Sequence, residues 1–308
     1  MKMVSTILIM NILYRTKKYI LIGGIMNHNR QKGILLLIGT AILWSLGGVL
    51  IKGVQWSGVT VAGMRSIIAA IVILIFMGKP SFKFTWARLG AVISYAATVL
   101  LFVMATKMTT AANAILLQYT APIYTALLGI GLLKERVYKK DVVCIGIIFA
   151  GMILFFIDSL KVGNILGDVL ALLSGVSFGV MSVFMRMERD NDPVQSIFWG
   201  NIVTCIVTLP FMGQLTFTTE SVIGILLLGV FQLGLSYILY SKAIKHVSAL
   251  EAVLIPIIEP LLNPIWVMLL QKEVPSLYAV IGGVIVIGGV TARALNPKKL
   301  TIAVEESM

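Results

Sequence analysis

Residues 105–135, ATKMTTAANAILLQYTAPIYTALLGIGLLKE, align without a gap with residues 243–273, AIKHVSALEAVLIPIIEPLLNPIWVMLLQKE. Each segment is apolar, carries a proline near its centre and ends on Lys-Glu. The matched pairs include Ala105 and Ala243, Lys107 and Lys245, Ala111 and Ala249, Ala114 and Ala252, Pro122 and Pro260, Lys134 and Lys272, and Glu135 and Glu273. Self-similarity at a fixed spacing indicates a structural unit that occurs twice in the chain.

The composition is that of a membrane protein. Of the 308 residues, 58% are hydrophobic and only 12% are charged, and the mean hydropathy is +0.98. A soluble domain carries about a quarter charged residues, and a core of this size cannot bury so much apolar side chain. Lipid is therefore the expected solvent. Cys144 and Cys205 both lie in apolar stretches and indicate neither a disulfide nor a metal site.

Apolar stretches long enough to cross a bilayer make up most of the chain. At a rise of 1.5 Å per residue, about 20 apolar residues span the roughly 30 Å of hydrocarbon. Ten such stretches are predicted near residues 33–51, 58–77, 89–106, 110–133, 142–157, 166–185, 194–212, 221–241, 247–270 and 276–292. We therefore predict an all-α integral membrane protein with ten transmembrane helices.

The ten predicted helices divide into two units of five, at residues 33–157 and 166–292. Because five is an odd number, the second unit enters the membrane from the opposite side, and we expect an inverted repeat. Two inverted halves can open a central site alternately to either side, which is a recurring device of secondary carriers.

The orientation is predicted from the Lys and Arg residues of the loops, counted from Arg30. With both termini on the same side, the opposite side receives only Lys52, Lys107, Lys161 and Lys272. Since positively charged loops stay in the cytoplasm, we predict a multi-pass protein whose loops rich in Lys and Arg are cytoplasmic. Both termini are then cytoplasmic, and residues 293–308 form a cytoplasmic tail.

Residues 1–32 form a separate N-terminal extension. Its two apolar runs are split by basic residues between Arg15 and Lys18, and the first run lacks the cleavage site of a signal peptide. Met26 opens a polar segment that leads directly into the first predicted span, so Met26 is a candidate for the natural start of translation. An additional interfacial helix is the alternative.

These features resemble the drug/metabolite transporter superfamily, specifically its EamA-type members, over about residues 33–292. The resemblance rests on Trp44-Ser45 through to Lys52, Arg65, Leu132-Leu133-Lys134-Glu135-Arg136, Glu259-Pro260 and Leu269-Leu270-Gln271-Lys272-Glu273. It implies a plasma-membrane carrier, commonly an exporter of amino acids, nucleosides or other metabolites and often driven by proton exchange. The alternatives are a structural or regulatory membrane protein, in which Glu259 pairs with Arg65, and an enzyme that acts on lipid.

Ionisable residues within the spans are the first candidates for function, because an ionised group at mid-membrane costs at least a few kcal/mol unless it is paired or hydrated. Glu259 lies about twelve residues, roughly 18 Å, into its span. That depth suits a proton-coupling carboxylate or a contact for a substrate amine, with a structural ion pair as the alternative. Glu251 and Asp168 lie nearer the ends of their spans, and a structural role is favoured for Glu251.

Arg65 has two interpretations. It is a candidate to bind a carboxylate of the substrate, and equally to clamp helices by donating to backbone carbonyls. The position that matches it in the second half holds the neutral Asn201.

Neutral polar residues in the spans either line a cavity or join helices by hydrogen bonds. They are Ser45, Ser94, Asn113, Gln118, Tyr119, Gln232, Tyr237 and Asn263. Asn113 and Gln118 are favoured for the cavity, since the fourth span is the symmetry mate of the ninth. Pro122 and Pro260 are expected to free carbonyls and to bend these two spans. Trp44 is a candidate for substrate stacking, with core packing as the alternative.

The sequence indicates neither an enzyme nor a nucleic-acid site. His28 and His246 are the only histidines and lie outside or at the end of the spans, which leaves no buried base for a nucleophile. No Walker-type phosphate loop is present, so ATP is not the expected energy source. Loop residues explain the net charge of +12 better than a nucleic-acid surface does. We expect no cofactor or metal. The expected partners are a small-molecule substrate, membrane lipid and protons.

Overall fold

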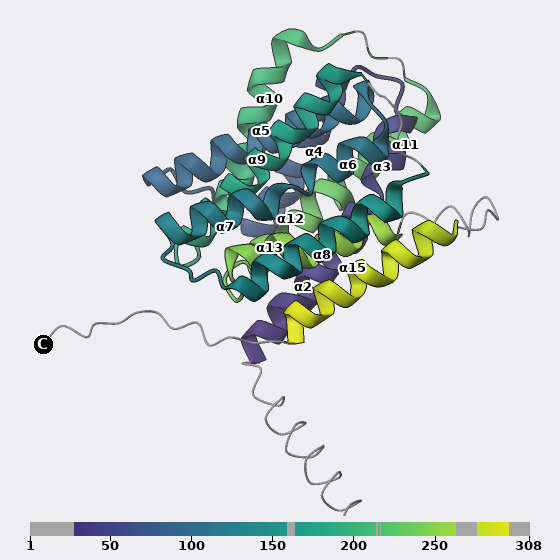
Figure 1. Cartoon of the computed structure of the whole chain (residues 1–308). Helices are drawn as coiled ribbons and strands as arrows, with labels where there is room; N and C mark the ends of the chain where they lie inside the picture. Colours follow the sequence, from purple (N-terminus) through teal and green to yellow (C-terminus); the bar gives the residue numbers. More distant parts are fainter. Residues whose placement is uncertain (1–27, 159–163, 214, 216, 263–275, 296–308) are drawn as a thin grey trace, which may run out of the picture.

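The described part of the chain is built from helices. The computed structural model describes residues 28–158, 164–213, 215, 217–262 and 276–295 (Figure 1). Within these ranges no β-strand occurs, and eight helical segments are long and apolar enough to cross a membrane. They are Asn29–Gly53, Gly58–Met77, Trp86–Met108, Ala111–Leu132, Ile165–Met187, Val194–Phe211, Thr219–Ala243 and Leu277–Ala294. Each agrees with a predicted span to within a few residues, and the all-helical prediction is confirmed.

The fifth and ninth predicted spans are represented differently. The fifth coincides with helix α8, Lys139–Phe156, which begins with two lysines and an aspartate, so only its later part is apolar. The ninth is represented by α13, Ala249–Leu254, and the 3-10 helix η3, Ile255–Ile258. Its last predicted residues, 263–270, lie outside the described residues, as does Asn263.

Side-chain caps fix where several helices begin. Besides α8, the uninterrupted helices are α4 (Gly58–Met77), α5 (Trp86–Met108), α9 (Ile165–Met187), α10 (Val194–Thr208) and α15 (Leu277–Leu295). Helix α10 is followed by the 3-10 turn η1 (Leu209–Phe211). The first N–H groups of a helix lack an internal partner, and Ser, Thr and Asn side chains accept from them. Such caps are Ser57 of α4, Thr85 of α5 and Asn164 of α9.

Besides the ninth predicted span, three of the eight long spans are interrupted within the bundle. The first consists of α2 (His28–Trp44) and α3 (Gly47–Gly53), the fourth of α6 (Ala111–Gln118) and α7 (Ala121–Leu132), and the eighth of α11 (Thr219–Leu227), the π-helix η2 (Leu228–Leu235) and α12 (Ser236–Ala243). At the first break, the Ser45 hydroxyl donates to Ile42 O at 2.6 Å, and two glycines follow. Both features weaken an α-helix. At the second break, Pro122 lies in the first turn of α7, where its missing N–H leaves no bond unmade.

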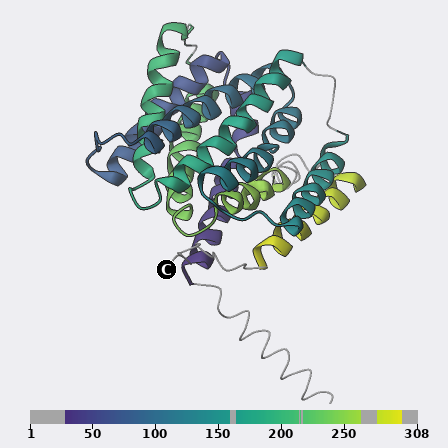
Figure 2. The same cartoon turned by 60° about the vertical axis from the view of Figure 1, so that its left-hand side comes forward.

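Helices from the two halves of the chain pack against one another. α5 packs along α9, α4 along α10, α2 along α12, and α8 along α15. The pair of α8 and α15 lies at one side of the bundle in both views (Figures 1 and 2). Large apolar side chains are exposed on the outside, among them Ile75, Val142, Ile165 and Leu277. Such a surface is suited to lipid rather than to water.

The ion pairs between described residues all lie at one end of the bundle, called here the charged end. The pairs are Arg30–Glu251, Arg88–Glu188, Glu135–Arg186, Asp141–Arg293, Glu251–Arg293, Arg189–Asp190 and Asp192–Lys245. Glu135, which follows α7, contacts both α9 and the start of α13, because it accepts from Arg186 and from the backbone N–H of Ala249. Burial raises the pKa of the Glu135 carboxyl, although Arg186 lies 3.4 Å away.

Gly282 marks a close approach of α8 and α15, which gives a first test of the packing. A Cβ on Gly282 would lie 2.6 Å from the backbone oxygen of Gly151, and nearer still to the backbone nitrogen of Phe155. We expect Gly282→Ala to separate the two helices and to lower the free energy of unfolding by about 1–3 kcal/mol.

Gly288→Ala is the matched control for this substitution. Among the described residues, no atom lies within 4 Å of a methyl group added at Gly288 on the same helix. Thermal unfolding of both proteins in detergent checks the prediction. Equal unfolding midpoints for the two variants would contradict the packing of α8 on α15.

Candidate functional site

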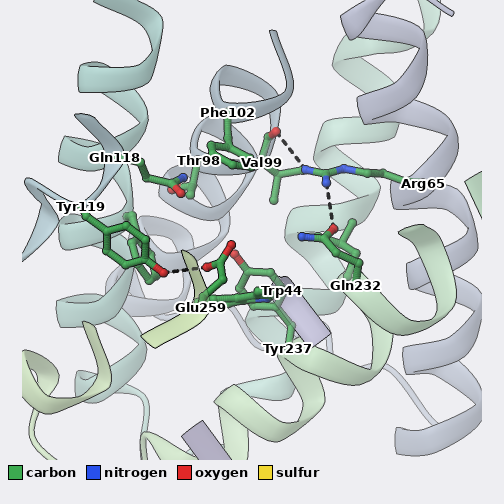
Figure 3. Close-up of a pocket in the computed structure, with 12 residues that line it drawn as sticks. Trp44, Arg65, Thr98, Val99, Phe102, Gln118, Tyr119, Gln232, Tyr237 and Glu259 are labelled. Carbon is green, nitrogen blue, oxygen red and sulfur yellow. Dashed lines mark hydrogen bonds between the residues drawn. The ribbon is translucent and has the colours of Figure 1, made fainter. Parts of the chain in front are cut away.

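A buried cavity lies between the two halves of the chain (Figure 3). It is lined by Trp44, Arg65, Thr98, Val99, Phe102, Gln118, Tyr119, Phe178, Gln232, Leu233, Tyr237 and Glu259. Several of these residues stand at the helix interruptions, where Trp44 ends α2, Gln118 ends α6, Gln232 belongs to η2 and Glu259 follows η3. The cavity has room for only a few water molecules, so a larger solute requires its walls to move apart.

Glu259 lies at one side of the cavity and is held by a tyrosine. Its carboxyl is buried, with 7% of the residue exposed, and Oε2 lies 2.6 Å from the hydroxyl oxygen of Tyr119. The Tyr119 hydroxyl also lies 2.9 Å from the backbone oxygen of Pro256. Among the described residues no Lys, Arg or His forms an ion pair with Glu259.

Pro260 explains why the Pro256 oxygen is available to Tyr119. In a regular helix the N–H of residue 260 would donate to the oxygen of residue 256, but proline has no N–H. The Pro256 oxygen accepts instead from the backbone N–H of Glu259, and the phenol of Tyr119, from the other half of the chain, supplies a second donor to it. Since the phenol has a single hydrogen, it donates to Glu259 or to Pro256 but not to both at once.

Arg65 lies across the cavity from Glu259 (Figure 3). It is 2% exposed, its Nη1 donates to Gln232 Oε1 at 2.9 Å, and its Nη2 donates to Val99 O at 3.2 Å. Its Nε has no hydrogen-bond partner among the described residues, and no carboxylate there forms an ion pair with it. This conformation therefore does not contain the Arg65–Glu259 ion pair that the structural alternative requires.

Aromatic rings form the wall beneath these two groups. The Trp44 ring lies 5.7 Å from that of Phe178, 5.1 Å from that of Tyr237 and 5.6 Å from that of Tyr240. The indole N–H of Trp44 donates to Ser236 Oγ at 2.9 Å, which fixes the orientation of the ring. Contacts of this kind give the cavity an apolar, preorganised surface.

Gln118 is held toward the cavity by a short chain of hydrogen bonds. Its Nε2 donates to Ser174 Oγ at 2.8 Å, and the Ser174 hydroxyl donates to the backbone oxygen of Thr98 at 3.1 Å. Gly175 makes room for the end of α6, because a Cβ there would lie 2.7 Å from Gln118 O. The amide is therefore fixed by its surroundings.

Two predicted site residues lie away from the cavity. Asn113 donates to Asp168 Oδ1 at 3.2 Å, near the start of α9. Glu251 accepts from Arg30 Nη2 at 2.5 Å and from Arg293 Nη1 at 3.3 Å, and its second oxygen accepts from the backbone N–H of Ser248 at 3.1 Å. Glu251 thus completes a capping box at the charged end. Of the predicted residues, the structure brings together Glu259, Arg65, Gln118, Trp44, Tyr119, Gln232 and Tyr237, whereas Ser45 and Ser94 are not among the residues that line the cavity.

Several cavity residues escaped the sequence analysis, namely Thr98, Val99, Phe102, Phe178 and Leu233. A signal for one of them was present, since Trp44 to Lys52 resembles Phe178 to Arg186 in the second half of the chain. The structure places those two aromatic residues face to edge across the wall of the cavity. The other four residues are ordinary helix residues, and nothing in their sequence context separates them from lipid-facing neighbours.

The arrangement suits recognition of a small solute and binding of a proton. Among the described residues, no cluster of His, Cys, Asp and Glu suitable for a metal ion occurs. The cavity offers one carboxyl group, one guanidinium group, two amides and an aromatic wall. Such groups bind a small polar solute and exchange a proton.

Comparison with known proteins gives a consistent result. The sequence model described as the EamA-like transporter family matches residues 31–157 and again residues 165–292. A protein of Archaeoglobus fulgidus named "uncharacterized transporter" is 25% identical over 84% of this chain and 96% of its own length. The "uncharacterized transporter YdfC" of Bacillus subtilis (strain 168) is 25% identical over 88% of this chain and 94% of its own.

A solved structure titled "Crystal structure of protein" shares the fold. It superposes with a TM-score of 0.74 at 17% sequence identity, and the match covers 88% of this chain and 100% of that chain. At this identity the likeness concerns the arrangement of the helices alone.

Proposed function

The chain belongs to the EamA-like transporter family and is a membrane transporter, and we propose that it is a secondary carrier that exports a small metabolite or amino acid in exchange for protons. Transport proceeds by alternating access to the central cavity. The observation that carries this proposal is the position of Glu259, buried in the cavity and hydrogen-bonded to Tyr119 without a cation partner among the described residues.

A carboxyl group in this position is suited to proton coupling. An ionised carboxylate buried without a cation is costly, so its charge depends on whether water or a cationic group reaches it. Tyr119 serves both states of Glu259, since its hydroxyl donates to the carboxylate in one and to Pro256 O in the other. Opening of the cavity to either side would thus allow Glu259 to release or take up a proton.

Alternating access is supported by the symmetry of the packing. When each helix is replaced by its counterpart in the other half, an observed contact becomes another observed contact. The contact of α5 with α9 corresponds to that of α12 with α2, and the contact of α4 with η2 corresponds to that of α10 with α5. The contacts of α4 with α10 and of α8 with α15 map onto themselves. This pattern is expected of ten transmembrane helices in two inverted repeats, the arrangement that lets two halves exchange conformations.

The charged end is proposed to face the cytoplasm of a plasma membrane, together with both termini. It carries the loops rich in Lys and Arg, and such loops are usually found on the cytoplasmic side of a membrane protein. The ion pairs there join helices of both halves, so we propose that this conformation is closed toward the cytoplasm. Inward opening would require some of these pairs to separate.

Purified protein reconstituted in liposomes tests the proposal. A pH-sensitive dye inside the vesicles reports proton movement when amino acids, nucleosides or small organic acids are added outside. We expect at least one class to drive a saturable proton flux that is absent from protein-free vesicles. Solute exchange without proton movement would refute the coupling but not the carrier. If the panel produces neither proton movement nor solute exchange across the vesicle membrane, the carrier proposal is contradicted.

A further inference from the structure

We infer that the transported solute carries a carboxylate that binds Arg65, and that Gln232 occupies this position while the carrier is empty. The inference rests on the proposed function and adds to it a substrate class and a specificity-determining residue. Its basis is the set of contacts that Arg65 makes and those that it leaves unmade.

Arg65 has more hydrogen-bonding capacity than its surroundings use. A guanidinium group has five N–H donors, and the described residues accept from it through Gln232 Oε1 and Val99 O. Both acceptors are neutral, and Nε is buried without a partner among the described residues. A helix clamp would be expected to satisfy all its donors internally, whereas this group retains donors for a further acceptor and a full charge to be neutralised.

Gln232 stands where an anion would bind. Its carbonyl oxygen lies 2.9 Å from Nη1 of Arg65 and presents to the guanidinium a single neutral oxygen. A carboxylate offers two charged oxygens, and hydrogen bonds between charged groups are about twice as strong as neutral ones. A solute carboxylate that enters the cavity is therefore expected to displace the Gln232 side chain from Arg65.

The backbone around Gln232 is suited to such a displacement. Gln232 belongs to η2, and π-helical turns inside α-helices occur frequently at functional sites. A Cβ on Gly47, at the break between α2 and α3, would lie 2.9 Å from Gln232 Nε2. The Gln232 amide thus lies directly against the interruption in the first span.

The rest of the cavity limits the class of solute further. Trp44, Phe102 and Phe178 provide an apolar wall, which suits an organic group attached to the carboxylate. Glu259 on the opposite side disfavours a second negative charge, because two like charges in one buried site repel. We therefore assign to the cavity organic monocarboxylates, including zwitterions, rather than dicarboxylates or phosphate esters.

Thermal unfolding of the purified protein with matched solutes tests this inference. Each of a panel of amino acids, hydroxy acids and aromatic monocarboxylates is compared with its own primary amide, which keeps the shape and removes the charge. We expect one or more carboxylates to raise the unfolding midpoint while the corresponding amides do not. The effect should be lost in Arg65→Gln.

Two substitutions of Gln232 separate binding from folding. Gln232→Glu places a permanent carboxylate beside Arg65, so we expect it to raise the midpoint of the solute-free protein and to abolish stabilisation by carboxylates. Gln232→Met removes the competing oxygen at similar size, and we expect carboxylate Kd to fall about threefold to tenfold, the equivalent of one neutral hydrogen bond.

Several results would overturn the inference. They are equal stabilisation by carboxylates and amides, unchanged carboxylate binding in Gln232→Glu, and the absence of a shift with every carboxylate tested. Flux of an uncharged or purely cationic solute in the liposome assay would also overturn it, but would leave the carrier function standing. Different observations would therefore refute the carrier function and the specificity for carboxylates.

Discussion

Glu259→Gln is expected to leave a folded carrier that exchanges solute between the two sides of a vesicle but no longer responds to a pH gradient. Glutamine has the shape of the protonated acid and cannot release a proton, so the cavity stays permanently in its neutral form. Its amide group can donate to the Tyr119 hydroxyl oxygen, which lies 2.6 Å from the carboxyl oxygen in the native protein, while that hydroxyl donates to Pro256 O as in the neutral form. Accumulation driven by an imposed pH gradient should fall at least about tenfold, the range of a typical coupling free energy.

Glu251→Gln provides the matched control in the same predicted span. Glu251 is buried like Glu259, but it is paired with Arg30 and Arg293. The same substitution should therefore lower the unfolding midpoint, because Arg30 and Arg293 each lose a carboxylate, although Arg293 keeps its pair with Asp141, while the dependence of flux on pH is retained. Flux from Glu259→Gln that still follows the pH gradient would remove Glu259 from the coupling mechanism.

The membrane spans could be predicted from the sequence because the ability of a segment to cross a membrane depends mainly on its amino-acid composition. Apolar runs of about 20 residues have few alternatives to a transmembrane helix. The same argument identified Arg65 and Glu259, since a charged residue inside such a run requires either a partner or a cavity. The structure places both at a cavity and leaves them unpaired with one another.

The interruptions and the roles of the neutral residues depend on contacts that local sequence does not contain. The break at Ser45 lacks a proline, and η2 carries no recognisable signal for a π-helix. Glu251 lies on the same span as Glu259, but its environment is decided by Arg30 at the far end of the chain. Asn113 was predicted to line the cavity only because its span is the symmetry mate of the ninth. In the structure it donates to Asp168 of α9, away from the cavity.

Glu188→Gln is expected to cause a large loss of stability at the charged end. Glu188 and Arg88 form an ion pair at 3.1 Å, with 1% and 5% of their side chains exposed, and join the end of α9 to the start of α5. The Thr85 hydroxyl donates to the other carboxyl oxygen at 2.5 Å. Substitution leaves the Arg88 charge buried without a counter-ion, which typically costs about 3–5 kcal/mol.

The neighbouring pair of Arg189 and Asp190 is the control, because it has the same charges at the same helix end but is exposed, with 36% and 83% of the side chains accessible. Exposed pairs contribute about 0–1 kcal/mol, so Asp190→Asn should leave the unfolding midpoint in detergent almost unchanged. Combining Glu188→Gln with Arg88→Met should recover part of the loss, since no buried charge then lacks a counter-ion. If Glu188→Gln and Asp190→Asn unfold at the same temperature, the buried pair does not join α5 to α9, and the charged end must be held closed by other contacts.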